Sequence, residues 1–228
     1  MSNYDLDVII TTNSKNESFV KMTNNAIMSL RNSVGGDRFK IIIVETNTNA
    51  EEYPEANVTV KPNEPYQCNK FYNLGALHSE SDFLLVANND TIFDVNWWVH
   101  MKKAFVDNNL DTACLQCTNE QPDIYNRWFK QKHTFKNLDG YDWFFGQAWC
   151  ITADVRSWLF PLDEKIHFYF NDDDMVMRFK EKNCKHQLVY KSKMQHLQGK
   201  SHEILKDEGR FYEVTWGSKE YFDQKWQK

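Results

Sequence analysis

The chain has 228 residues and a formal net charge of -5, with 41% hydrophobic and 15% aromatic residues. This length fits one α/β domain, and the apolar fraction is sufficient for a buried core. The acidic balance excludes a generally basic nucleic-acid-binding protein, although it is compatible with local basic patches. There is no apolar run of about 18 residues, and the start, MSNYDLDVII, lacks the regions of a signal peptide. We therefore expect a cytoplasmic protein (host cytoplasm if the gene is viral) without stable membrane insertion.

The cysteines form an odd and scattered set: Cys68, Cys114, Cys117, Cys150 and Cys184. Cys114 and Cys117 make a C-x-x-C pair, but no second pair or nearby histidine completes a zinc site. We expect all five to be structural, reduced thiols, which suits a cytoplasmic setting.

The first part of the chain alternates apolar strands with amphipathic helices. The β-branched run LDVIITT is typical of a buried strand, whereas Phe19, Met22, Ala26 and Leu30 fall on one helical face. In chain order we expect a strand at 6–12, a helix at 18–32 with Ser18 as its N-cap, a strand at 39–45, a brief strand at 58–60, a helix at 67–79 and a strand at 82–87. The alternation predicts a mostly parallel sheet covered by helices on both faces.

Polar clusters follow three of these strands directly. They are Thr11-Thr12-Asn13, Glu45-Thr46-Asn47 and Asn88-Asn89-Asp90. Because ligands of such sheets bind outside the carboxyl ends of the strands, the three clusters predict one shared site.

The second part of the chain is less regular. We expect a helix beyond residue 94, a strand at 112–116, a long functional loop at 118–145, a strand at 148–152 leading into a short helix, a helix from about 171 to 182 and a strand around 187–190. The stretch from 191 to 228 is basic at first and aromatic later, and is interpreted as a tail.

Two acidic positions stand out. Asp90, at a strand end among short polar side chains, is suited to holding Mg²⁺ or Mn²⁺ beside a diphosphate, although a simple Asn-Asp turn would explain it too. Asp172, Asp173 and Asp174 repel one another unless a cation offsets them, and the apolar run HFYF directs them toward the core. Helix capping is the alternative role. A partly buried carboxylate in this place is a candidate general base.

Three further side chains have weaker signals. His196 is a candidate metal ligand close to Gly199, although a lone histidine is more often structural. Lys70 and Asn73 could reach a phosphate or a base, or could form an ordinary solvated helix face.

The order of these segments resembles the family 2 glycosyltransferases of GT-A fold, particularly the rhamnosyltransferase-like group. The resemblance covers roughly residues 5–202 and rests on the segments VIITTN, IIIVETNTN, NKFYNLGALHSESDFLLVANND, FFGQAWCITADVRSW, FPLDEKIHFYFNDDDMVMRFKEKNCK and HLQGKS. It implies a Rossmann-like domain over 1–205, with a nucleotide-sugar half at 1–93 and an acceptor half at 94–205, followed by an aromatic extension at 206–228.

The resemblance also implies roles for individual residues. Asp90 would hold the metal, His196 would be a further ligand, and Asp172 would be the base, organised by Asp174 and Arg178. The donor side would comprise Thr11, Thr12, Asn13, Glu45, Asn47, Lys70, Asn73, Asn88 and Asn89, and the acceptor side Trp143, Gly146, Trp149 and Asp173. Two positions depart from the family pattern: Asn88 replaces the first acidic residue of the D-x-D triplet, and Asn171 replaces the glutamate before the base. Metal affinity would then depend partly on the donor diphosphate.

The expected function is inverting, Mn²⁺- or Mg²⁺-dependent transfer of a hexose or pentose from a nucleotide sugar, with UDP favoured as the nucleotide. The acceptor is left open between a free or lipid-linked glycan and hydroxymethylated cytosine in phage DNA. DNA would need a basic track, for which two stretches exist: Arg127, Lys130, Lys132, His133 and Lys136, then Lys180, Lys182, Lys185, Lys191, Lys193 and Lys200. A non-catalytic module that binds a nucleotide sugar or glycan is the alternative from another class, and a nucleotidyltransferase is a third. The sequence does not indicate an oligomeric state.

Overall fold

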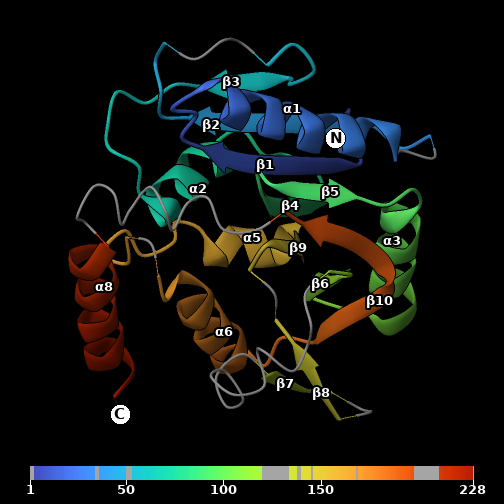
Figure 1. The fold of residues 1–228 in the computed structure, drawn as a ribbon. Helices are drawn as coiled ribbons and strands as arrows, with labels where there is room; N and C mark the ends of the chain where they lie inside the picture. Colours follow the sequence, from blue (N-terminus) through green and yellow to red (C-terminus); the bar gives the residue numbers. More distant parts are fainter. Residues whose placement is uncertain are drawn as a thin grey trace.

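The computed structural model describes residues 3–33, 36–49, 53–119, 134–137, 140–144, 146–167, 169–197 and 211–227 (Figure 1). Its centre is an eight-stranded sheet with the strand order β3-β2-β1-β4-β9-β6-β10-β5. A two-stranded antiparallel hairpin, β7 (Thr134–Asn137) and β8 (Gly140–Trp143), forms a separate sheet. None of the described helices is long and apolar enough to span a membrane.

The N-terminal half of the sheet is parallel, as predicted. Its elements are β1 (Leu6–Thr12), α1 (Glu17–Asn32), β2 (Phe39–Glu45), β3 (Val58–Val60), α2 (Cys68–Ala76) and β4 (Phe83–Asn88). Strand β1 lies between β2 and β4, with Thr12 opposite Glu45 and Thr11 opposite Asn88. The carboxyl ends of three strands therefore meet at one edge.

The C-terminal half is mixed. It contains β5 (Thr91–Phe93), α3 (Trp97–Asn108), β6 (Thr112–Cys117), β9 (Ala148–Thr152), α5 (Ala153–Leu159), α6 (Asn171–Glu181), β10 (His186–His196) and α8 (Phe211–Trp226). Strand β9 runs antiparallel to both β4 and β6, and β10 is parallel to β6 but antiparallel to β5. The expectation of a mostly parallel sheet thus describes the first half better than the second.

The sheet separates two buried clusters, because successive side chains of a strand point to opposite faces. On β1, Val8 and Ile10 join the cluster that contains Trp97 of α3, whereas Ile9 joins the other cluster. That second cluster is built with α2, α5 and α6, and includes Val176. Helices on both faces therefore cover a sheet that is apolar on both sides, as the sequence predicts.

Several local predictions need correction. The N-cap of α1 is Asn16, not Ser18, because the Oδ1 of Asn16 accepts hydrogen bonds from the amides of Ser18 (3.0 Å) and Phe19 (3.3 Å). Helix α2 ends at Ala76 rather than at residue 79, and β10 is longer than the predicted 187–190. The hairpin β7–β8 lies inside the predicted loop 118–145, and α8 occupies the predicted tail. The five cysteines are free thiols, as expected.

Candidate functional site

The three polar clusters converge as the parallel register requires. The side-chain amide of Asn89, after β4, donates to the hydroxyls of Thr12 (3.0 Å) and Thr23 (3.2 Å). Thr12 ends β1, and Thr23 belongs to α1. Asn88 lies opposite Thr11 in the register of β1 and β4. The strand ends therefore form a continuous polar edge, joined by hydrogen bonds between elements.

Glu45, at the end of β2, is completely buried and stabilises this edge from inside the protein. Its carboxylate accepts hydrogen bonds from the amides of Ser14 (3.1 Å) and Asn47 (2.8 Å) and from the hydroxyl of Tyr53 (2.6 Å). Burial, and then the hydrogen bond to Glu45, raises the pKa of Tyr53. Asn47 closes the network by donating to the carbonyl of Ser14 (2.7 Å). The carboxylate of Glu45 therefore fixes the chain that follows β1 and the chain that follows β2. Asn13, the first residue after β1, is half-buried.

Asp90 and His196 form a pair at the same edge. The Oδ1 of Asp90 lies 3.1 Å from the Nε2 of His196, and both side chains keep some exposure, 13% and 14%. The side-chain nitrogen of Asn88 lies 3.5 Å from the same Nε2. Asn119 holds the backbone of His196 on both sides, accepting from its amide (2.9 Å) and donating to its carbonyl (2.7 Å).

This pair fits a divalent ion that takes most of its ligands from elsewhere. Among the described residues, no group of three or more His, Cys, Asp or Glu side chains is placed to bind a metal. Asp90 offers a hard oxygen and His196 an imidazole nitrogen, so the remaining positions would need water or a donor diphosphate.

The acidic cluster opens helix α6, and Asp172 is its outward member. Phe170, with φ of 68°, is the N-cap of the helix. The half-buried carboxylate of Asp172 lies directly against Gly146, where a Cβ would fall on its oxygen and carbon atoms. Gly146 is therefore the residue that leaves room for Asp172.

The other two carboxylates are buried and offset by cations. Asp174, 1% exposed, accepts a hydrogen bond from the indole Nε1 of Trp226 (2.8 Å) and pairs with Lys225 (2.7 Å). Burial lowers the pKa of Arg178 while the charge of Asp174 opposes that shift, and the guanidinium donates to the carbonyl of Trp158 (3.1 Å). Asp173 likewise opposes the lowering of the pKa of Lys180 that burial causes.

Polar side chains of α2 and of the residue Tyr66 before it form a group near Asp172. Burial raises the pKa of Cys68 to about 12; a hydrogen bond with Tyr72 opposes this shift, and the charge of Asp172 adds to it. The Nδ2 of Asn171 lies 3.5 Å from the sulfur of Cys68. The hydroxyl of Tyr66 is 2.9 Å from that of Thr11, which links this group to the end of β1. The sequence interpretation assigns no role near the site to Tyr66 or Tyr72, and treats Cys68 with the other cysteines.

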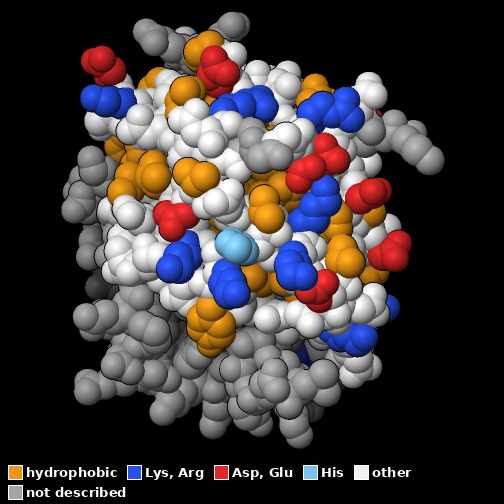
Figure 2. Space-filling view, turned by 90° about the vertical axis from the view of Figure 1, so that its right-hand side faces the viewer, with side chains coloured by type: hydrophobic (Ala, Val, Ile, Leu, Met, Phe, Trp, Pro, Cys, Tyr) orange, Lys and Arg blue, Asp and Glu red, His pale blue; other side chains and the backbone are white. Residues whose placement is uncertain are grey.

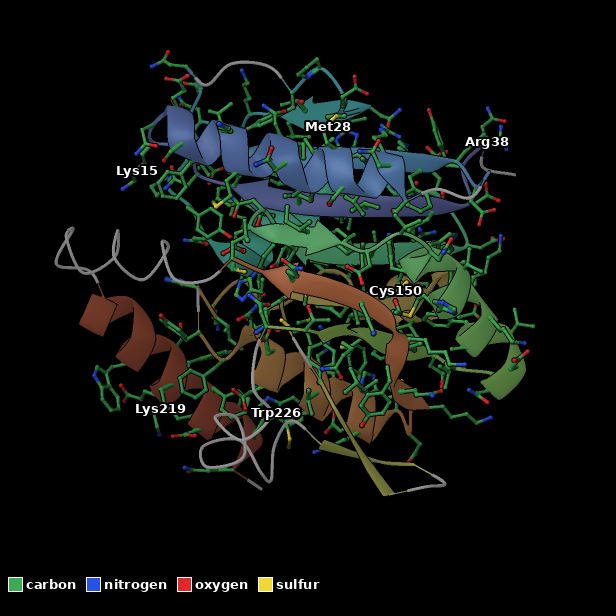
Figure 3. All side chains as sticks on the ribbon, turned by 45° about the vertical axis from the view of Figure 1, so that its right-hand side comes forward. Lys15, Met28, Arg38, Cys150, Lys219 and Trp226 are labelled. Atoms are coloured by element: carbon green, nitrogen blue, oxygen red, sulfur yellow. The ribbon has the colours of Figure 1, made fainter. Side chains whose placement is uncertain are left out.

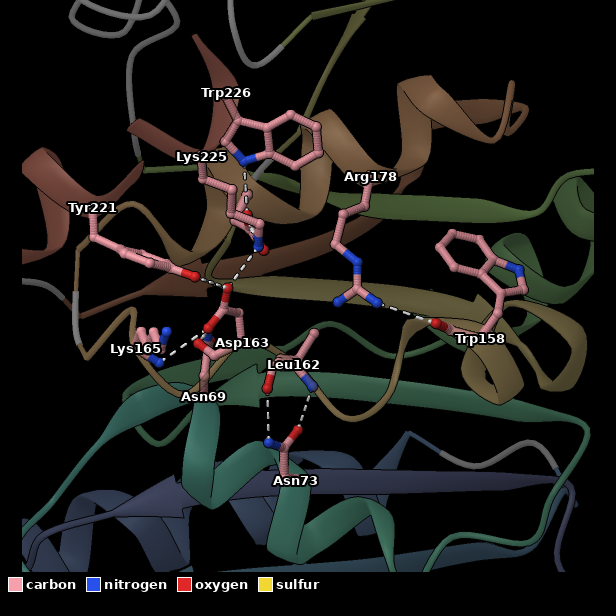
Figure 4. Close-up of polar contacts among 11 residues, drawn as sticks. Asn69, Asn73, Trp158, Leu162, Asp163, Lys165, Arg178, Tyr221, Lys225 and Trp226 are labelled. Atoms are coloured by element: carbon pink, nitrogen blue, oxygen red, sulfur yellow. Dashed lines mark hydrogen bonds and ion pairs between the residues drawn. The ribbon is translucent and has the colours of Figure 1, made fainter. Parts of the chain in front are cut away.

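Asn73 and Lys70 bind neighbouring segments of the chain. The amide group of Asn73 donates to the carbonyl of Leu162 (3.0 Å) and accepts from its N–H (2.6 Å), which anchors the segment before α6 (Figure 4). Lys70 pairs with Glu64. Asn69, beside them on α2, donates to the carbonyl of Asp163 (2.9 Å). Asn69 and Asn73 therefore fix the segment that leads into α6, whereas Lys70 binds the chain before α2.

The structure places the expected acceptor residues in different environments. Trp149 has no exposed surface and packs against Tyr72 and Phe144, so in this structure it supports the site from within the core and does not form a surface for an acceptor. The side chain of Trp143 lies outside the described residues. Gly146 and Asp173 flank Asp172 as described above.

The second of the two basic stretches is partly engaged by other side chains where the structure describes it. Lys180 interacts electrostatically with Asp173, and Lys182 lies over the ring of Trp158 at 5.9 Å. Lys191 and Lys193 are exposed on β10. The face that carries α3 and β10 mixes basic, acidic and hydrophobic side chains (Figure 2). The side chains of the first basic stretch, and Lys200, lie outside the described residues.

The architecture and the polar strand edge define an α/β protein of GT-A fold. The family model named glycosyl transferase family 2 matches residues 7–166. The chain therefore belongs to this family.

Solved structures resemble the chain at low sequence identity. A mannosyltransferase from Pyrobaculum calidifontis, PcManGT, in complex with GDP-Man and Mn²⁺, has a TM-score of 0.64 at 12% identity, and the match covers 87% of this chain and 58% of that one. TarS 1-349 of S. aureus, in complex with UDP, has a TM-score of 0.58 at 12% identity, covering 76% and 54%. The chain thus spans little more than half the length of these two structures. No curated protein sequence matches it significantly.

Proposed function

We infer that this chain is an inverting, divalent-metal-dependent glycosyltransferase that moves a sugar from a nucleoside-diphosphate donor, with UDP favoured, to a hydroxyl group. The observation that carries the proposal is the polar strand edge with the Asp90–His196 pair, together with the carboxylate of Asp172 over Gly146. The bound ligands of the two similar structures, GDP-Man with Mn²⁺ and UDP, support a nucleotide-sugar donor.

The donor would lie along the strand edge, with its nucleoside near Thr11, Thr12 and Asn13 and its diphosphate near Asn88 and Asn89. Glu45 would contribute through the backbone segments that it holds, since its carboxylate is already engaged by three internal donors. Asn47 extends this support, and Asn73 fixes the segment before α6. Lys70, which pairs with Glu64, would reach the donor from α2. A divalent ion held by Asp90 and His196 would offset the charge on the leaving diphosphate.

Asp172 is the proposed base. It takes the proton of the acceptor hydroxyl as the oxygen forms a bond to the anomeric carbon, and the bond from that carbon to the diphosphate oxygen breaks with its electron pair. The anomeric configuration inverts, because the acceptor attacks opposite the leaving group. Asp174 and Arg178 hold the first turn of α6, and Gly146 leaves the carboxylate room to face the acceptor.

The acceptor is proposed to be a glycan hydroxyl, in line with the resemblance to the rhamnosyltransferase-like group. Hydroxymethylated cytosine in DNA is the second candidate, and it rests on the exposed lysines Lys191 and Lys193. An assay of nucleoside diphosphate release with each acceptor class separates the two. Release accelerated by modified DNA but not by glycans would reverse the order.

The test of the proposed function is Asp172→Asn. The amide is nearly isosteric but cannot take the proton, so we expect nucleoside diphosphate release to fall by about 10²–10⁴-fold, while the donor still raises the melting temperature as in the wild type. Asp107→Asn is the matched control, because Asp107 is exposed on α3 and pairs with Lys103 away from the site. Wild-type turnover by Asp172→Asn would remove Asp172 from the base role.

A further inference from the structure

Helix α8 contacts the chain on both sides of Asp172. The ring of Phe222 packs on that of Phe170, two residues before Asp172, with centroids 5.6 Å apart. Lys225 and Trp226 both bind the Oδ1 of Asp174, two residues after it. The backbone that carries the proposed base is therefore held at two points by one helix, which lies beyond the residues matched by the family model.

The same helix also holds the segment that leads into α6. Lys225 reaches the carboxylate of Asp163 at 2.8 Å, and the hydroxyl of Tyr221 donates to the same oxygen at 3.0 Å (Figure 4). The amide of His167 donates to the hydroxyl of Ser218 (3.2 Å). Lys225 thus joins Asp163 and Asp174, which belong to the incoming segment and to the first turn of α6.

Two properties of this turn make such support necessary. Phe170 has a positive φ of 68°, a conformation that residues with a side chain adopt only when their surroundings hold them there. Three successive carboxylates follow within one turn, and their mutual repulsion is relieved only if cations lie close. The ring of Phe222 meets the first need, and the ammonium group of Lys225 meets part of the second.

We propose that Lys225 and Trp226 are positioning residues for Asp172, so that α8 is part of the catalytic apparatus without touching the reacting atoms. The inference rests on the proposed function, because it assigns a support to the proposed base. The helix fixes the direction of the Asp172 carboxylate by holding one oxygen of Asp174 through an ion pair with Lys225 and a hydrogen bond from the indole N–H of Trp226.

The test compares variants of α8. Lys225→Met removes the charge but keeps the aliphatic stem, Trp226→Phe removes the indole N–H but keeps a ring, and Lys225→Arg conserves the charge. Lys219→Met is the matched control, because Lys219 pairs with Asp223 inside α8. Trp226 lies at the end of the helix nearest α6, and Lys219 lies farther from α6 (Figure 3). Release of nucleoside diphosphate is measured with UDP-GlcNAc, UDP-glucose, UDP-galactose and GDP-mannose in the presence of Mn²⁺.

We expect Lys225→Met to lower kcat by about tenfold or more, with KM for the donor within about twofold of the wild type, because a displaced base slows the chemical step and leaves the donor side intact. Trp226→Phe should lower kcat in the same way but less, Lys225→Arg should restore most of the activity, and Lys219→Met should match the wild type. Equal kcat values for Lys225→Met and Lys219→Met would overturn the inference, as would a change confined to KM.

Two measurements separate this inference from the proposed function. If Asp172→Asn keeps full turnover, the proposed base is wrong whatever the α8 variants do. Hydrogen exchange of the amides at 171–176 gives a readout that needs neither a donor nor activity. Faster exchange in Lys225→Met and Trp226→Phe, but not in Lys219→Met, supports the positioning role, and unchanged exchange in all three contradicts it.

Discussion

Asp172 and Gly146 form a single arrangement at the scale of residues. The carboxylate occupies the space that a side chain at position 146 would need. The glycine lies just before β9, whereas the aspartate lies in the first turn of α6, so two elements must be in register for the fit. Two features thus set the direction of the Asp172 carboxylate. Gly146, just before β9, has no side chain to displace it, and helix α6 carries it.

Gly146→Ala tests this fit. The added methyl group cannot coexist with the present carboxylate position, so Asp172 must turn away, and we expect turnover to fall by about tenfold or more with little change in donor-induced stabilisation. Gly217→Ala is the control, since a Cβ there meets nothing within 4 Å. The measurement is kcat beside the melting temperature; a Gly146→Ala enzyme with wild-type kcat would show that the carboxylate has room elsewhere.

Residue by residue, the sequence predicts the outer parts of the site better than its supports. The polar clusters after β1, β2 and β4 are recognisable because each follows an apolar strand, and a parallel sheet must bring such ends together. The pairing of Asp90 with His196 depends on the antiparallel contact between β5 and β10, which apolar periodicity does not reveal. Cys68 and Tyr66 carry no pattern at all, since their role arises from packing between segments distant in sequence.

At the scale of elements, α8 is the main difference between expectation and structure. Its buried positions Ser218, Phe222 and the partly buried Trp226 recur every four residues, which is a helical spacing. The face is hard to recognise because it includes a serine and because Lys225, a charged residue, is also turned inward toward Asp163 and Asp174. The helix is stabilised by docking onto the buried Asp174 and the partly buried Asp163, so neighbours in space rather than local propensity define it.

The docking of α8 should depend on pH at both ends of the range. Burial raises the pKa of Asp163, but hydrogen bonds from Lys225, Lys165 and Tyr221 outweigh this and lower it. The contribution of Asp163 to the stability of the fold is therefore fully present above its pKa in the unfolded chain, about 3.9. It is lost as the pH falls through the lower pKa of the folded state. Burial lowers the pKa of Lys225, but Asp163 and Asp174 outweigh this and raise it. The contribution of Lys225 to stability is complete below its pKa in the unfolded chain, about 10.4. It is lost as the pH rises through the higher pKa of the folded state.

The measurement is the difference in melting temperature between the wild type and Lys225→Met across pH. We expect a constant difference from about pH 5 to 9 that shrinks toward both extremes, because the pair loses one charge at each end. For Lys219→Met, whose partner Asp223 is the partly exposed i+4 residue of the same helix, the difference should stay close to zero. A difference for Lys225→Met that does not change with pH would show that packing of the aliphatic stem, not charge, accounts for the effect.

At the scale of the whole molecule, the sheet joins two halves with different tasks. The parallel strands β3, β2, β1 and β4 present the polar edge, and the mixed strands β9, β6, β10 and β5 bring Gly146 and His196 to it. The sequence predicts the first half well because alternating strands and helices have few alternative arrangements. The second half places β9 between β4 and β6, which requires long-range pairing that no local pattern specifies.

Because the site draws on both halves, donor binding should stabilise the whole fold. A nucleotide sugar at about 100 times its Kd adds about 2.7 kcal/mol by mass action, which for a chain of this size raises the melting temperature by about 5–10 °C.

If Asp90 and His196 hold the ion, part of this shift in melting temperature should require Mn²⁺. We therefore expect Asp90→Ala to lose the Mn²⁺-dependent part and keep the rest, since the donor still contacts the strand edge. Asp94→Ala is the control, an aspartate beyond β5 that is not part of the pair. An equal Mn²⁺-dependent shift in Asp90→Ala and the wild type would place the ion elsewhere, and a wild-type shift that Mn²⁺ leaves unchanged would contradict metal-supported donor binding.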